Sequence, residues 1–188
     1  MFLAVACGDD EEVAPSPTLR PAVGASVTPA VSTERGTPIP ATGSTARVDF
    51  QAKPNPATGA AQLVDVRVGA HPEDGGYDRI VFEFKAGRPA GKVEYVTTAA
   101  QCGSGQPVDP QGGATLLVHF EATNAHNDQG QLTIPAVKVT GPGNSVLESI
   151  SICDFEAVVQ WAVGTNGMKP FVVSLLDNPS RVVVDVKH

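Results

Sequence analysis

The sequence predicts an all-β domain, an antiparallel β-sandwich or barrel-like sandwich of about nine or ten strands, preceded by a disordered tail. Three observations lead to this prediction. Apolar residues alternate with polar ones in short runs through residues 47–188, and turn-forming residues separate the runs. The chain contains 19 glycines and 16 prolines, as many turns require. No convincing amphipathic helix interrupts the pattern, so we expect one all-β domain over residues 47–188.

The N-terminus is similar to the end of a bacterial lipoprotein signal peptide. Residues 1–7 read MFLAVAC and are followed by Gly8 and an acidic run. In such signals the cysteine becomes the new N-terminus and is acylated, so Cys7 is the predicted lipidation site. The pattern departs from the usual one because Ala4 stands where Leu is common, and because six residues are too few for a complete signal. We therefore interpret residues 1–7 as the remnant of a signal peptide; the alternative is an unrelated apolar N-terminus.

Residues 8–46 predict a disordered linker between this anchor and the domain. They hold six prolines and no aromatic residue, and small residues and Ser/Thr fill the rest. Such a segment cannot bury enough apolar area to offset the entropy of ordering it. With a lipid on Cys7 the protein would be extracytoplasmic and held at the membrane by its lipid alone, or else secreted.

The alternation within residues 47–188 also assigns side chains to the core. The expected inward-facing sets are Val64, Val66 and Val68; Ile80, Phe82 and Phe84; Phe155, Ala157, Val159, Trp161 and Val163; and Val182, Val184 and Val186. The last strand, residues 181–186, carries an unbroken run of valines. A strand that is apolar on both faces is expected in the middle of a sheet rather than at its edge.

The cysteines of the domain predict one disulfide if the protein is exported. Cys102 and Cys153 lie 51 positions apart, and no cysteine has the spacing of a zinc ligand. In an oxidising compartment the two would form a bond. The alternative is two free cysteines in the core.

Charge and motif content exclude several kinds of function. The net charge is −7 and no basic run is present, so nucleic acid is not an expected partner. No G-x-S-x-G turn occurs, and no two of the four histidines have the spacing of a zinc protease motif. Loops around His71 and His126 could at most hold a metal between them, and the acidic loops 71–76 and 127–130 lack the calcium-loop pattern. We expect no enzyme activity, no cofactor and no metal.

Three stretches together resemble the AMIN-like domain of secreted lipoproteins. They are the sequence GYDRIVFEF at residues 76–84, the sequence DFE at residues 154–156 with Trp161 and Gly164 after it, and the sequence PSRVVVDV at residues 179–186. The resemblance covers residues 75–187 well and residues 47–74 loosely. It implies an all-β sandwich and a non-catalytic role in localisation or binding at the cell envelope, with peptidoglycan or another cell-wall glycan as the expected ligand.

Four residues are the candidates for ligand binding. Arg79, Arg181 and Asp185 flank valine-rich strands and could form a polar strip for sugar hydroxyls or peptide carboxylates. Tyr77, beside two glycines, is the expected exposed aromatic residue. The alternative for the charged residues is structural pairing across strands.

Two further functions remain open at this point. A protein-interaction or scaffold module of an envelope complex would bind a protein partner, for example by strand addition at a sheet edge. An enzyme or small-molecule carrier would need a pocket around His71, His119 or His126.

Overall fold

The structure is a computed structural model that describes residues 43–54, 60–73 and 75–188. The predicted lipidation site Cys7 and residues 8–42 of the predicted linker lie outside the described residues. None of the described residues forms a helix with the length and apolarity needed to cross a membrane.

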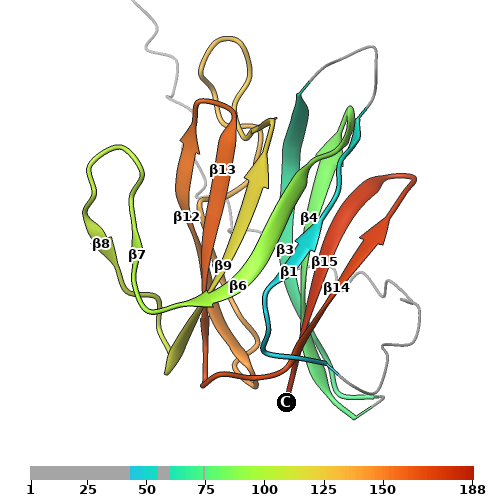
Figure 1. The fold of residues 1–188 in the computed structure, drawn as a ribbon, viewed down its shortest axis with the longest axis vertical. Helices are drawn as coiled ribbons and strands as arrows, with labels where there is room; N and C mark the ends of the chain where they lie inside the picture. The colour runs from blue at the N-terminus through green and yellow to red at the C-terminus, as the bar shows by residue number, and fades with distance from the viewer. Residues whose placement is uncertain (1–42, 55–59, 74) are drawn as a thin grey trace, which may run out of the picture. The chain divides into compact units, whose positions relative to one another are not determined.

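Two β-sheets face each other and enclose the core (Figure 1). The six-stranded sheet has the order β1 (Val48–Phe50), β6 (Ala90–Val96), β9 (Ala114–Glu121), β13 (Val158–Thr165), β12 (Val146–Phe155) and β11 (Lys138–Thr140). The five-stranded sheet has the order β10 (Thr123–Asn124), β3 (Ala61–His71), β4 (Tyr77–Lys85), β15 (Ser180–Lys187) and β14 (Phe171–Leu176). Two small two-stranded sheets pair β2 (Lys53–Pro54) with β5 (Gly87–Arg88), and β7 (Ala99–Ala100) with β8 (Pro107–Val108).

This architecture confirms the predicted all-β sandwich. Within the described residues, ten strands have three residues or more, and the other five have two each. All pairings are antiparallel except that of β10 with β3. The valine-rich last strand, β15, lies between β4 and β14, so its predicted central position is also confirmed.

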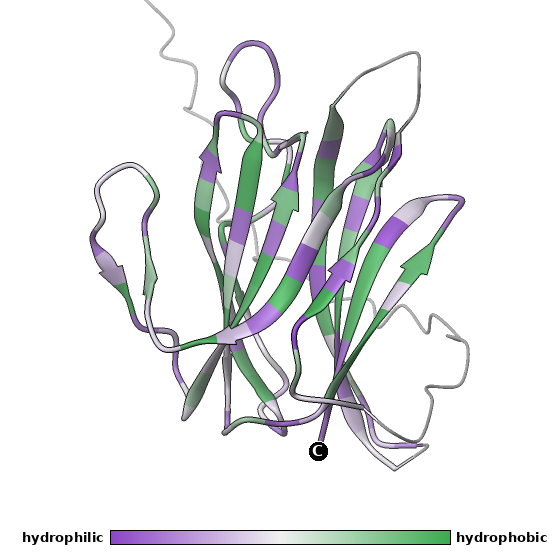
Figure 2. Ribbon diagram, viewed as in Figure 1, coloured by the Kyte–Doolittle hydropathy of each residue, from purple (hydrophilic) through white to green (hydrophobic). Residues whose placement is uncertain are grey.

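The core lies between the sheets and is built from alternate residues of each strand. Figure 2 shows hydrophobic and hydrophilic residues alternating along the main strands. Phe82 of β4 packs edge-on against Phe120 of β9 and Trp161 of β13, with ring centroids 5.1 and 5.9 Å apart. All three are fully buried. Because aromatic residues are scarce in this chain, this contact between the sheets is surrounded mainly by valine, leucine and isoleucine.

Two of the predicted inward-facing sets each contain a first residue that does not lie in the core, Val64 in one set and Phe155 in the other. A local feature of the backbone explains each error. In β3 a bulge between Leu63 and Asp65 makes Val64 the extra residue, so that Leu63 rather than Val64 lies in the core. In the turn between β12 and β13, Glu156 and Ala157 have φ values of 49° and 59°. These values are typical of a type I′ turn, which ends the alternation, and Phe155 is 60% exposed.

A hairpin arm covers part of the outer face of the six-stranded sheet. Strands β7 and β8 form this arm, and Ala99 packs there with Ile152 and Ala162 in a small second core. A disulfide joins Cys102 of the arm to Cys153 of β12, with Cα atoms 5.2 Å apart. The predicted disulfide is therefore confirmed, and it fixes a long glycine-rich and proline-rich segment against the sheet.

Candidate functional site

Two of the candidate ligand-binding residues form a buried ion pair. Asp185 of β15 lies directly opposite Arg79 of β4. Arg79 donates from Nε to Oδ1 at 2.6 Å and from Nη2 to Oδ2 at 2.9 Å, and the two side chains are 7% and 0% exposed. This two-pronged geometry matches the alternative of structural pairing across strands.

Tyr77 lies next to this pair, but it is not the exposed aromatic residue that was expected. Its exposed fraction is 4%. The ring of His71 stacks on it at 4.8 Å, and the guanidinium carbon of Arg79 lies 5.2 Å from its centroid. Tyr77 is the first residue of β4, where His71 of β3 and Lys187 of β15 lie opposite it and beside its ring.

Arg181 is placed apart from the other three. It begins the opposite half of β15, pairs in register with Glu83, and donates from Nε to the carbonyl oxygen of Pro179 at 3.3 Å. Four residues along a strand separate it from Asp185 by about 13 Å. The structure thus brings Tyr77, Arg79 and Asp185 together and leaves Arg181 outside that group.

Asp78 connects the two sheets through several hydrogen bonds. Nothing in the sequence indicated this role. Its fully buried carboxylate accepts hydrogen bonds from the backbone N–H groups of Ser145 (2.7 Å) and Val146 (2.9 Å). Asn144 Nδ2 donates to it at 3.3 Å, and His188 Nε2 lies 3.0 Å from Oδ1. Burial raises the pKa of Asp78, but these hydrogen bonds outweigh it, so the pKa lies below its usual value. The group ties β4 to the start of β12 in the other sheet.

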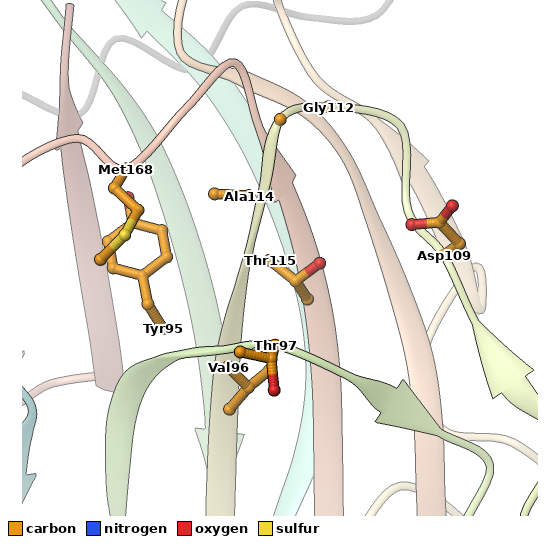
Figure 3. A pocket seen from close by; sticks show the side chains of 9 residues that line it. Tyr95, Val96, Thr97, Asp109, Gly112, Ala114, Thr115 and Met168 are labelled. Carbon is orange, nitrogen blue, oxygen red and sulfur yellow. The ribbon is translucent and has the colours of Figure 1, made fainter.

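A pocket of about 420 Å³ opens at one end of the six-stranded sheet (Figure 3). It lies where β6 ends and β9 begins, beside the segment that follows β8 and beside Met168 in the β13–β14 connection. Its lining consists of Tyr95, Val96, Thr97, Asp109, Gly112, Gly113, Ala114, Thr115 and Met168. In Figure 3, Tyr95 and Met168 lie at one side and Asp109 at the other, with the threonines between them.

Two contacts hold the walls of this pocket in place. The hydroxyl of Tyr95 donates to the carbonyl oxygen of Lys169 at 2.8 Å and accepts from its N–H at 2.9 Å. Gly112 has a φ of 140°, and a Cβ there would collide with the carbonyl oxygen of Thr165. Glycine is therefore needed for the close approach that forms the rim. Sequence reasoning missed this pocket because its residues come from four separate segments and share no motif.

The four histidines lie apart from this pocket. None of them lines the pocket. His126 Nδ1 lies 2.8 Å from Asp154 Oδ2, and His119 Nδ1 lies 2.8 Å from Gln160 Nε2. Burial and the neighbouring Lys92 lower the pKa of His119. Among the described residues, no group of three or more His, Cys, Asp or Glu side chains is arranged to hold a metal ion.

The stretches that resemble a known family include strand β4, which starts at Tyr77, and the central strand β15. The model of the AMIN-like domain family matches residues 61–188. The chain belongs to the AMIN-like domain family. The match begins at the first residue of β3 and continues to the C-terminus, so it includes ten of the eleven strands of the two main sheets, all but β1. No curated protein and no solved structure matches the chain.

Membership in this family associates the domain with the cell envelope. AMIN-like domains are generally extracytoplasmic. The disulfide between Cys102 and Cys153 agrees with that location, because such bonds persist in oxidising compartments and are rare in the cytosol. The arm that this disulfide holds also carries one side of the pocket, since Thr97 precedes β7 and Asp109 follows β8.

Proposed function

We propose that this AMIN-like domain is a non-catalytic binding module that attaches to a cell-wall component, with peptidoglycan as the ligand. The family match over residues 61–188 is the observation that carries the proposal. The disulfide supports it, because the domain would meet the wall only after export. The pocket supports it as well, since it offers a small concave site, whereas the candidate residues Arg79 and Asp185 are paired with each other.

Cosedimentation with isolated cell-wall sacculi tests this proposal. The full chain, prepared with its disulfide formed, should pellet with sacculi in a saturable manner. An unrelated disulfide-bonded β-sandwich of similar net charge is the control for nonspecific trapping. Enrichment no greater than that of the control would contradict the proposal.

We propose further that Cys7 carries a lipid that holds the protein at the membrane. The motif MFLAVAC-G supports this part of the proposal. The replacement Cys7→Ser should move the protein from the membrane fraction to the soluble fraction of the producing cells. Equal partitioning of the wild type and the variant would contradict lipidation at this residue.

A second candidate function is strand addition by a protein partner at β14. This strand, with the sequence FVVSLL, is the last strand of its sheet, and Leu175 is 37% exposed. Among the described residues, only Ser44 bridges its outer edge, at Phe171. An apolar edge without lysine or proline can pair with another chain. The replacement Val173→Pro should then abolish capture of an envelope protein by cross-linking and leave sacculus binding unchanged.

A further inference from the structure

We propose that the pocket between Tyr95, Met168 and Asp109 is the subsite for one uncharged N-acetylated sugar. This inference rests on the proposed function and adds the chemistry and position of the contact. It differs from the sequence-based candidates Tyr77, Arg79, Arg181 and Asp185, none of which lines the pocket.

The charge of the lining selects against anions. Among the described residues that line the pocket, Asp109 is the only carboxylate and none is a lysine, arginine or histidine. A phosphate or carboxylate ligand would meet a negative group with no cation to offset it, which makes an anionic ligand unfavourable. A neutral ligand with hydroxyl groups can instead donate to the Asp109 carboxylate.

The polar and apolar groups are separated in a way that fits such a sugar. The ring of Tyr95 and the thioether of Met168 lie on one side, and the carboxylate of Asp109 lies on the other (Figure 3). The hydroxyls of Thr97 and Thr115 can donate or accept between them. An N-acetylated sugar carries the same separation, with a methyl group at one position and hydroxyl groups at others.

The apolar side is placed before any ligand arrives. The hydroxyl of Tyr95 is bonded to both the N–H and the carbonyl oxygen of Lys169, which fixes the connection that carries Met168. Phe171 packs against the Tyr95 ring with centroids 5.9 Å apart. Met168 itself is 62% exposed, so it can contact a ligand directly. The Tyr95 side chain therefore loses little conformational entropy when a ligand binds, and this favours a measurable affinity for a small ligand.

The size of the pocket agrees with one sugar residue rather than a long segment of polymer. Its volume of about 420 Å³ falls at the lower end of the range of about 300–1,000 Å³ for small-molecule sites. We therefore expect weak binding of each sugar. Attachment to a wall would rely on the many copies of that sugar within the polymer.

Methionine labelling gives a direct test, because the chain has only two methionines, Met1 and Met168. The full chain with ¹³C-methyl methionine should show two methyl signals by NMR. Titration with N,N′-diacetylchitobiose should shift the Met168 signal saturably and leave the Met1 signal as an internal control. Glucosamine, which lacks the acetyl group and carries a positive charge, should produce no comparable shift.

Two matched pairs of variants locate the contact. Asp109→Ala should weaken disaccharide binding about two- to tenfold, the range for one hydrogen bond, whereas Asp128→Ala in a distant exposed loop should not. Met168→Ala, followed by tyrosine ring signals, should weaken binding, whereas Leu132→Ala should not. All four residues are exposed, so the replacements should leave the fold intact.

Each outcome decides the inference. No shift of the Met168 signal up to millimolar sugar overturns it, and sacculus binding that persists would show that the proposed function survives without this pocket. A larger response to glucosamine that disappears in Asp109→Ala would replace the sugar subsite with a site for an ammonium group. A saturable shift without sacculus binding would keep the subsite and contradict the proposed function.

Discussion

Replacing Asp78 by alanine tests how the two sheets are held together at one end of the sandwich. The replacement leaves the backbone N–H groups of Ser145 and Val146 without their acceptor, and both residues are fully buried. An unsatisfied buried donor costs about 1–3 kcal/mol, so the pair should cost about 2–6 kcal/mol of unfolding free energy. This is a large part of the total of about 5–15 kcal/mol expected for a single domain.

The matched control is Asp78→Asn. Its amide oxygen can still accept from Ser145 and Val146, while its N–H₂ group faces Asn144 and His188, which can reorient. We expect this variant to lose only the charge assistance, about 1 kcal/mol. Urea unfolding followed by the fluorescence of Trp161, the only tryptophan, measures both. The reasoning is refuted if alanine costs no more than asparagine, because the orphaned donors are what separates the two variants.

The same residue gives a pH dependence with a definite sign. Because the pKa of Asp78 is lowered in the folded state, its contribution is complete above the unfolded pKa of about 3.9 and is lost as the pH falls through the folded pKa. Wild-type stability should therefore decline below about pH 4. Asp78→Asn should decline less steeply in that range, because the titrating group is absent. If the unfolding free energies of the two proteins declined equally below about pH 4, this assignment would be contradicted.

Three further results are expected from the fold. Replacing both Cys102 and Cys153 by serine should cost about 4 kcal/mol, since the bond closes a loop of 51 residues, and comparing oxidised with reduced wild type checks this value. Arg79→Met should cost about 3–5 kcal/mol by leaving Asp185 buried without its cation, and the double variant Arg79→Met/Asp185→Leu should recover most of that loss in urea unfolding. Phe155→Ser should change the unfolding free energy by at most about 0.5 kcal/mol, and a loss of several times that would mean that this side chain is not exposed.

The sequence predicted the strands where alternation continued without interruption. Ile80, Phe82 and Phe84 follow one period through β4, and their inward orientation was read from that period alone. The errors at Val64 and Phe155 come from a bulge and a type I′ turn. Both are features of the backbone. The bulge shifts the alternation by one residue and the turn ends it, and the residue types at these positions do not indicate either feature.

The site was predicted less well, because its residues meet through the pairing of distant segments. The pairing of Arg79 with Asp185 depends on the register of β4 with β15, which the alternation of each strand leaves undetermined. The pocket depends on the position of the β7–β8 arm, which brings Asp109 towards Thr97 and Thr115. The prediction that Cys102 bonds to Cys153 contained part of this information, since that bond holds the arm.

Binding of the full chain to isolated sacculi, measured as a saturation curve in competition with N-acetylated disaccharide fragments of the wall, tests the central claim most directly. The account predicts saturable binding that the fragments reduce, together with weaker binding of Asp109→Ala and unchanged binding of Asp128→Ala. Binding that does not exceed that of an unrelated β-sandwich, or that the fragments leave unchanged, would contradict it.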